Sequence, residues 1–201
     1  MEEILRPRRR PSQQRSRERY ARILSCAREV LVTQGFESFT FDEVAKRAEV
    51  PIGTLYQFFA NKYVLICELD RCDAEAITAE LEKFSQRVPT LQWPEFLDEF
   101  IDHLADLWAK DPSRRAVWLA VQSTPATRLT AADTEQQLLL MIAHVLKPLN
   151  PRAEEKQRME TASILLHTVF SLLNYGVEGH LEFTVEELKK MLLAYLFSVA
   201  G

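Results

Sequence analysis

The side chains best placed to form hydrogen bonds with another molecule lie between Thr40 and Lys62. This stretch has the pattern of two short helices joined by a tight turn, because Pro51 lacks a backbone donor and interrupts the helical spacing. The second helix gathers its large apolar residues on one face, and four small or polar residues point elsewhere: Gly53, Thr54, Tyr56 and Gln57. Side chains of this kind can approach the edges of DNA bases and exchange hydrogen bonds with them.

The helix that precedes the turn has to hold this surface in place. From Asp42 to Ala48 its apolar residues form a narrow stripe that suits packing against a second helix. Thr40 and Glu43 have the spacing of a capping box, which predicts that this helix begins directly after Thr40. On spacing alone, an ordinary helical hairpin that binds nothing is as good an interpretation as a DNA-reading motif.

The pattern as a whole resembles the DNA-binding signature of the tetracycline-repressor (TetR) family. The residues that carry the resemblance are Gly35, Phe36, Thr40, Val44, Ala45, Ala48, Val50, Gly53, Thr54, Leu55, Tyr56, Phe59 and Lys62. Two positions depart from the family pattern, since Glu49 stands where glycine is commonest and Pro51 where serine is common. We therefore expect a left-handed backbone at Glu49 and a second helix without a side-chain cap.

The resemblance implies an all-α fold, with an N-terminal three-helix helix-turn-helix DNA-binding domain and a helical C-terminal ligand-binding and dimerisation domain. We expect a disordered arginine-rich arm over residues 1–14, the DNA-binding domain over 15–61 and the C-terminal domain over 62–201. The low glycine content, 5 of 201 residues, agrees with an all-helical protein because it leaves little material for phosphate-binding loops or hairpins. The long helix that begins at Lys62 would act as the lever between the two domains.

The resemblance also assigns the DNA contacts. In the family, residues at the positions of Thr40, Tyr56 and Lys62 typically contact phosphates. Residues near the start of the second helix approach the bases, and in this chain they are Ile52, Gly53, Thr54 and Gln57. Gln57 suits adenine, because its amide can donate to and accept from that base. The expected partner is double-stranded DNA with a palindromic operator that matches a two-fold dimer.

Positive charge is concentrated near the start of the chain. Residues 1–62 contain 12 Lys and Arg against 8 Asp and Glu, although the whole chain has a net charge of −4. Arg8, Arg9 and Arg10 form a run inside the segment expected to be disordered. We interpret this run as an arm that contacts the DNA backbone or minor groove, since arginine-rich segments gain affinity by releasing counterions. A solubilising tail is the alternative.

A pocket for a small, largely apolar effector is a further implication of the resemblance. The candidate lining residues are aromatic, amphipathic or polar side chains on otherwise apolar helices: Trp108, Trp118, Gln122, His144, His167, Phe170 and Asn174. Taken singly, such a residue is more often a satisfied core or surface group than a ligand contact. His103, His144 and His167 lie on separate helices without carboxylate partners at metal-ligand spacing, so we expect no metal site and no cofactor.

The last two helices are apolar around most of their circumference, which predicts cover on both sides. The first spans about residues 162–177, and the second is expected to open with a capping box of Thr184 and Glu187. We expect one side to face the internal core and the other to face a second copy in a four-helix interface, formed by Leu173, Val177, Leu188, Leu192, Tyr195 and Leu196. In the alternative, both helices are central in a monomer.

These features together predict a ligand-responsive, sequence-specific transcriptional regulator, and most simply a repressor that an effector releases from its operator. A non-specific nucleic-acid-binding or scaffolding protein that uses only the basic arm is the main alternative. An enzyme is poorly supported, because the chain has no nucleophile elbow, phosphate loop, dinucleotide fingerprint or paired metal motif. Three unpaired cysteines, and the lack of an apolar leader or membrane-spanning run, predict a cytoplasmic protein without a membrane partner.

Overall fold

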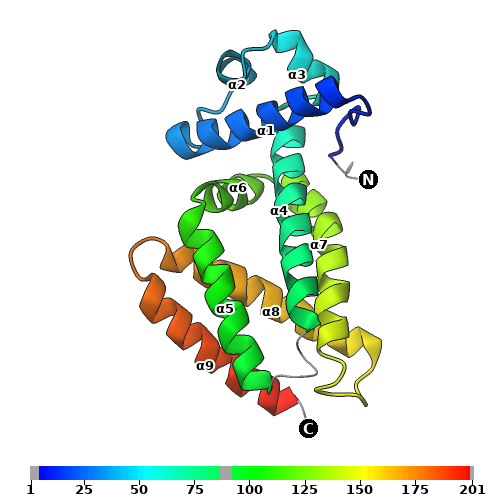
Figure 1. The fold of residues 1–201 in the computed structure, drawn as a ribbon, viewed down its shortest axis with the longest axis vertical. Helices are drawn as coiled ribbons and strands as arrows, with labels where there is room; N and C mark the ends of the chain where they lie inside the picture. Colours follow the sequence, from blue (N-terminus) through cyan, green and yellow to red (C-terminus); the bar gives the residue numbers. More distant parts are fainter. Residues whose placement is uncertain (1–4, 87–91, 200–201) are drawn as a thin grey trace. The chain divides into compact units, whose positions relative to one another are not determined.

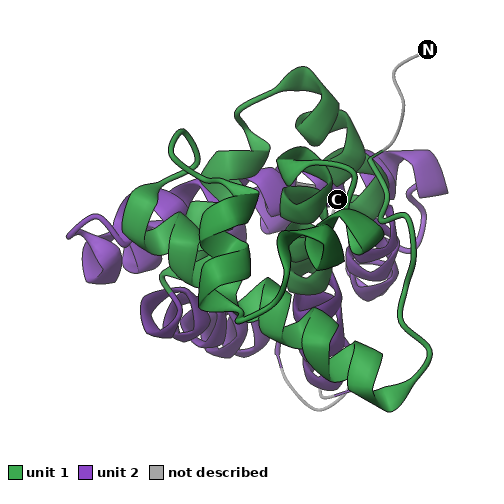
Figure 2. Ribbon diagram, turned by 90° about the horizontal axis from the view of Figure 1, so that it is seen from above, with its two compact units in different colours: residues 1–74, 112–135 green, residues 75–111, 136–201 purple. Residues whose placement is uncertain are grey.

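The computed structural model describes residues 5–86 and 92–199, and every regular element in these ranges is a helix (Figure 1). The all-α prediction is therefore confirmed. Packing divides the chain into two compact units, which Figure 2 colours separately. Unit 1 comprises residues 1–74 and 112–135, and unit 2 comprises residues 75–111 and 136–201.

Each unit is built from its own set of helices. Unit 1 contains α1 (Gln14–Gln34), α2 (Phe41–Arg47), α3 (Ile52–Phe58) and α6 (Ser113–Val121). Unit 2 contains α5 (Trp93–Lys110), α8 (Glu155–Gly176) and α9 (Leu181–Val199). Two helices contribute residues to both units, α4 (Lys62–Ser85) and α7 (Pro125–Val145).

Unit 1 is larger than the DNA-binding domain expected from the sequence, because α6 packs on α1. The guanidinium of Arg28 on α1 donates to both carboxylate oxygens of Asp73 on α4, at 2.8 and 3.1 Å. It also donates to Ser113 Oγ, at the start of α6, at 3.1 Å. The boundary expected after residue 61 therefore does not coincide with the edge of unit 1, since α6 and the first part of α4 share its core.

Unit 2 is held by α9, which packs against both α8 and α5. The buried residues between them are large aliphatic side chains such as Leu173 and Leu188, which are fully enclosed. Lys189 of α9 adds an electrostatic tie, because its ammonium lies 2.9 Å from Asp98 and 2.7 Å from Asp102 on α5. These contacts explain why α8 and α9 need apolar residues on more than one face.

Helix ends follow the sequence signals in one case and not in another. α1 ends at Gly35, whose φ of 72° is a conformation that glycine adopts without strain. The capping box expected at Thr184 and Glu187 is wrong, because α9 already begins at Leu181. The amide of Thr184 donates to the carbonyl of His180 at 2.9 Å, and its side chain is buried within the first turn.

Candidate DNA-binding surface and ligand cavity

The turn between α2 and α3 has the geometry that its unusual residues predict. Thr40 caps α2 by accepting a hydrogen bond from the amide of Glu43 at 3.3 Å. Glu49 has a φ of 52°, which confirms the expected left-handed backbone at this position. Pro51 precedes α3 without a side-chain cap, as expected, and its carbonyl accepts from the amide of Thr54 at 2.8 Å.

The outer face of α3 presents four of the predicted base-reading and phosphate-contacting residues to solvent: Ile52, Gly53, Tyr56 and Gln57. Tyr56 is 46% exposed, and its ring packs on Phe41 at 5.1 Å between centroids. A Cβ atom added at Gly53 would meet nothing within 4 Å, so the backbone here is open to close approach. Thr54 is only 8% exposed, so the expectation that its side chain faces DNA is wrong for this structure.

Lys62 is engaged inside unit 1. Its ammonium donates to the carbonyls of Phe36 and Phe39 at 3.2 and 3.5 Å, and it lies 4.4 Å from the centre of the Phe36 ring. These contacts tie the start of α4 to the loop between α1 and α2. The structure thus gives Lys62 a structural role, and a phosphate would have to compete with two carbonyls for its charge.

The arginine-rich arm also differs from the expected disorder over the part that the structure describes. Arg8 joins the arm to the end of α3, because its amide donates to Phe58 O at 2.8 Å and its guanidinium donates to Tyr56 O at 3.0 Å. Arg10 lies 3.8 Å from the carboxylate of Glu68 on α4. Arg9 is exposed on the docked segment. Backbone hydrogen bonds and ion pairs hold residues that composition alone would leave loose.

Glu68 is the buried anion beneath this arm. The hydroxyl of Tyr20 donates to it at 2.7 Å, and the guanidinium of Arg71 donates to its two oxygens at 2.8 and 2.7 Å. Burial, with the hydrogen bond to Glu68 as a second cause, raises the pKa of the Tyr20 hydroxyl well above its usual range. Tyr20, Glu68 and Arg71 form a structural network in which the carboxylate charge is balanced, because each carboxylate oxygen accepts a hydrogen bond from the charged guanidinium.

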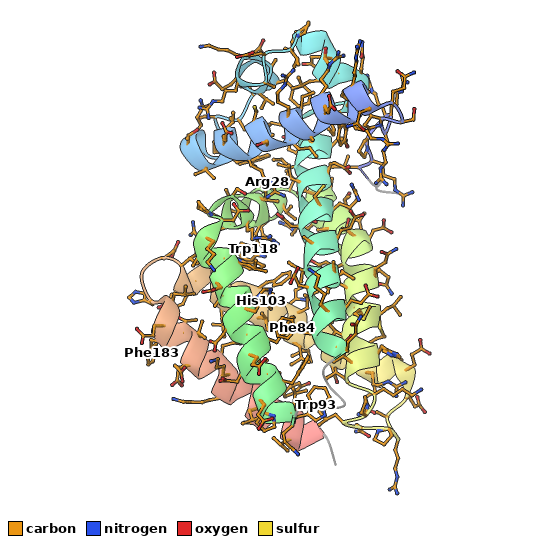
Figure 3. All side chains as sticks on the ribbon, in the orientation of Figure 1. Arg28, Phe84, Trp93, His103, Trp118 and Phe183 are labelled. Carbon is orange, nitrogen blue, oxygen red and sulfur yellow. The ribbon has the colours of Figure 1, made fainter. Side chains whose placement is uncertain are left out.

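Unit 2 contains a cavity of ≈ 80 Å³ between α4, α5, α7, α8 and α9. All of its lining side chains are aliphatic or aromatic, among them Ile77, Trp93, Phe100, Ile101, Leu104, Leu138, Ile142, Val169 and Phe170. Figure 3 labels Trp93 at the start of α5. A site of this composition can hold hydrocarbon, but its walls offer almost nothing that could fix a polar group.

Two family patterns cover most of this chain. Residues 91–200 match the model described as "Tetracyclin repressor-like, C-terminal domain", and residues 23–69 match "Bacterial regulatory proteins, tetR family". The chain belongs to the TetR family. It is accordingly a DNA-binding transcriptional regulator, and α2 and α3 are its helix-turn-helix.

Solved structures of TetR-family regulators share the fold over most of their length. FadR from Bacillus subtilis, in complex with stearoyl-CoA, has a TM-score of 0.71 at 20% identity and covers 89% of this chain and 98% of its own. Thermus thermophilus FadR, in complex with lauroyl-CoA, has a TM-score of 0.61 at 20% identity and covers 88% of this chain and 92% of its own.

Sequence relatives match over shorter stretches. The repressor KstR of Mycolicibacterium smegmatis is 37% identical over 70 residues, which is 32% of this chain and 34% of KstR. The regulator YdeS of Bacillus subtilis is 39% identical over 46 residues, or 23% of each chain. The chain therefore matches only about a quarter to a third of the length of these two relatives.

The effector residues predicted for this TetR-family chain are mostly elsewhere. Phe170 lines the cavity, and Trp108 packs on it at 5.3 Å between ring centroids. Trp108 and Asn174 are bonded to each other at 3.3 Å, behind the wall of the cavity. The remaining four residues do not line the cavity. Trp118 and Gln122 belong to unit 1, and His144 and His167 are exposed. Sequence reasoning missed the aliphatic lining, which carries no polar signal.

The predicted dimer residues are likewise mostly internal. Leu173, Leu188, Leu192 and Leu196 are buried in unit 2, while Val177 and Tyr195 are half-buried. These four leucines cannot form an interface without opening the core, so that expectation is wrong for them. The exposed apolar residues of the two helices are different ones: Ile164, Tyr175, Phe183, Met191 and Phe197. Phe183, which projects from α9 in Figure 3, is 72% exposed.

Two further expectations concern metals and membranes. His103, which had no carboxylate partner by sequence spacing, pairs with Glu80 of α4 at 2.9 Å. Across residues 5–86 and 92–199 no group of three or more His, Cys, Asp or Glu side chains is arranged to hold a metal ion. None of the helices described in these ranges has the length and hydropathy needed to cross a membrane.

Proposed function

We propose that this regulator is a repressor that binds a palindromic operator as a homodimer and is released by an apolar, chain-like effector. The observation that carries this proposal is the cavity in unit 2, whose lining side chains are all aliphatic or aromatic. A domain of this size has no need of a void in its core, since protein interiors are otherwise close-packed. The void is best explained as part of a ligand site.

DNA recognition rests on the exposed face of α3. Gln57 is solvent-exposed and can meet an adenine edge, while Gly53 lets the backbone come close to the groove. Tyr56 and Thr40 flank this face and supply hydroxyl groups for phosphates. In a two-fold dimer the two α3 helices would read half-sites about 34–36 Å apart, or a multiple of that spacing, so the operator should be palindromic.

A second copy is the natural cover for the exposed apolar stripe on α8 and α9. On α8 the apolar residues Ile164 and Tyr175 are exposed, and they lie on one helical face together with the polar residues His167 and Ser171. On α9 Phe183, Met191 and Phe197 are all more than half exposed. Two adjacent helices with unpartnered apolar faces suit a self-complementary four-helix interface.

The cavity indicates both the chemistry of the effector and its effect. Ligand pockets usually have volumes of about 300–1,000 Å³, so a site of ≈ 80 Å³ has to widen when it is occupied. Acyl-CoA complexes of the FadR proteins support a hydrocarbon chain as the occupant, because these proteins share the fold. Widening would displace α4 and α7, which also contribute residues to unit 1. Such a displacement can lower DNA affinity by a coupling of about 1–3 kcal/mol.

The first test is selection of bound sequences from random duplex DNA at about 150 mM salt, where phosphate attraction alone is weakened. Enrichment of a palindrome is expected, and lauroyl-CoA should then release the enriched duplex while free CoA should not. If binding at low salt enriches no sequence, the protein is a non-specific nucleic-acid binder that uses the arm. If the palindrome is enriched but no acyl chain releases it, the effector half of the proposal is wrong.

A further inference from the structure

A polar depression adjoins the apolar cavity of unit 2. It is lined by Leu146, Leu149, Asn150, Ala153, Gln157, Arg158, Thr161 and Leu196. Two of these residues, Leu146 and Leu196, also line the cavity. The two hollows therefore meet at a pair of leucines, with hydrocarbon on one side and hydrogen-bonding side chains on the other.

We propose that the effector is a single-chain amphiphile with an anionic head, whose tail fills the cavity and whose head is bound by Arg158. Asn150, Gln157 and Thr161 are the neutral donors beside that cation. This assignment rests on the proposed ligand function of the cavity and extends it to a head-group site. A carboxylate and a phosphate share the chemistry that a guanidinium recognises, because both accept paired hydrogen bonds.

Arg158 has binding capacity to spare. Its guanidinium donates to the carbonyl of Ala153, at the end of the loop that precedes α8. No carboxylate among the described residues lies within ion-pair distance of it, in contrast to Arg28 and Arg71, which each hold one. A guanidinium has five N–H donors, so a half-buried arginine with a single carbonyl partner is short of acceptors.

The Phe170 end of the cavity offers no comparable site among the described residues. Trp108 and Asn174 stand behind Phe170 there, but their donors are already used. The indole N–H of Trp108 donates to the amide oxygen of Asn174, and the amide nitrogen of Asn174 donates to Phe170 O at 2.8 Å. A polar head placed at this end would displace satisfied bonds, whereas at Arg158 it supplies a missing acceptor.

The length of the site fits a medium chain. From Thr161 in the depression to Phe170 in the cavity, α8 advances nine residues, or about 13 Å at 1.5 Å per residue. An extended peptide advances about 3.3–3.6 Å per residue, which contains three backbone bonds, so an extended alkyl chain advances about 1.2 Å per bond. A site about 13 Å long therefore accommodates an alkyl chain of about eleven bonds. Dodecyl compounds are therefore suitable probes.

The test measures direct binding to the whole chain through its intrinsic tryptophan fluorescence, to which Trp93 in the cavity wall contributes together with Trp108 and Trp118. Dodecanoate, dodecyl phosphate, lauroyl-CoA and dodecanol are titrated separately, and we expect at least one anion to bind about ten-fold more tightly than the alcohol. Arg158→Gln should abolish that preference and leave dodecanol affinity unchanged. Arg152→Gln is the matched control, because Arg152 is exposed in the loop that precedes α8 and does not line the depression.

Each outcome separates this inference from the proposed function. Comparison of the three anions identifies whether the head is a carboxylate, a phosphate or a CoA ester. Equal affinity for dodecanol and all three anions, or an unchanged preference in Arg158→Gln, overturns the head-group assignment while chain binding still supports the cavity as a ligand site. Failure of every dodecyl compound to bind overturns both. Val169→Phe, which narrows the cavity, should weaken all four probes alike if the tail lies there.

Discussion

Asp70 should make the stability of this protein depend on pH near neutrality. It lies on α4 in unit 1, and its Oδ2 atom is buried without a hydrogen-bond partner among the described residues. Burial, with the charges of Glu135 and Asp73 as further causes and Arg28 opposing them, raises the pKa of this carboxyl to about 7. We predict that Asp70→Asn stabilises the folded chain at neutral and alkaline pH, because asparagine has no proton to lose.

The pKa values give the sign and size of the effect. Because the folded-state pKa of Asp70 lies above its ordinary value of 3.8, the stability linked to its proton is complete below that value and is lost as pH rises through about 7. At about 1.4 kcal/mol per pKa unit, the whole loss is up to about 4 kcal/mol, of which about 2.5 kcal/mol falls between about pH 5 and pH 7.5.

Urea unfolding of the wild type and Asp70→Asn over this pH range measures the difference in the free energy of unfolding. The advantage of the variant should grow by about 2.5 kcal/mol from about pH 5 to pH 7.5 and then level off. Asp106→Asn is the control, since that exposed carboxylate has a pKa lowered by its hydrogen bond from Lys110 and should show no such growth. A difference between Asp70→Asn and wild type that stays constant with pH would refute the reasoning.

Four other variants test separate parts of the structure. Arg28→Met should lower the free energy of unfolding by about 2–4 kcal/mol, measured in urea, because it removes the two hydrogen bonds that Arg28 donates to the largely buried Asp73 carboxylate and leaves it with the more distant Arg114, at 3.6 Å, as its ion-pair partner. Glu49→Gly should raise the melting temperature through a gain of roughly 0.5–1 kcal/mol, since glycine accepts a φ of 52° without strain; a lower melting temperature would contradict this. Phe183→Glu combined with Met191→Glu should halve the mass seen in sedimentation equilibrium, and an unchanged mass would exclude this face as the interface. Gln57→Ala should weaken binding by about 1–3 kcal/mol on the selected sequence alone, so equal losses on all sequences would count against base reading.

The helix-turn-helix could be predicted in detail because its signals are local. Thr40 caps the next helix through a residue three positions away, and Gly35 ends α1 by its own backbone conformation. The left-handed backbone at Glu49 could be predicted because glycine is commonest at this position in the TetR family and this chain has glutamate instead. The φ of 52° at Glu49 confirms the prediction. Thr54 was predicted to be exposed but is buried. On a helix of seven residues, a small rotation about the helix axis is enough to exchange an exposed position for a buried one.

The apolar cavity could not be found in the same way. Ile101 and Leu138 line it, and in the sequence they look the same as residues that fill a core. Polar residues on apolar helices were predicted to line the pocket instead. His167 is one of them, yet it faces solvent and its ring nitrogen is hydrogen-bonded to Ser163 O of the same helix at 2.9 Å. An apolar void leaves no trace in hydrophobic periodicity, because both sides of the void require the same residue types. Its location depends on how five helices pack.

The proposed dimer face shows a similar division between what is local and what is not. Hydropathy correctly indicated that α8 and α9 carry apolar residues on more than one side. Which side faces inward is set by the packing of α9 on α8 and α5, and this packing encloses Leu173 and Leu188 while exposing Phe183. Sequence spacing identifies two apolar faces on each helix but does not tell which of them is buried. That choice depends on how the helices of unit 2 pack.

The basic arm shows why net charge does not say which cations can reach DNA. Arg8 bonds two carbonyls at the end of α3, where a cation is favoured by the helix dipole, so removing it would loosen the recognition helix. Arg10 is expendable, because Glu68 already has Tyr20 and Arg71 as closer partners and the Arg10 side chain is 62% exposed. A phosphate can therefore take Arg10 from Glu68 without leaving a buried charge unpaired. The electrostatic contribution of the arm to DNA binding should come from Arg9 and Arg10, with Arg8 fixing the helix that they flank.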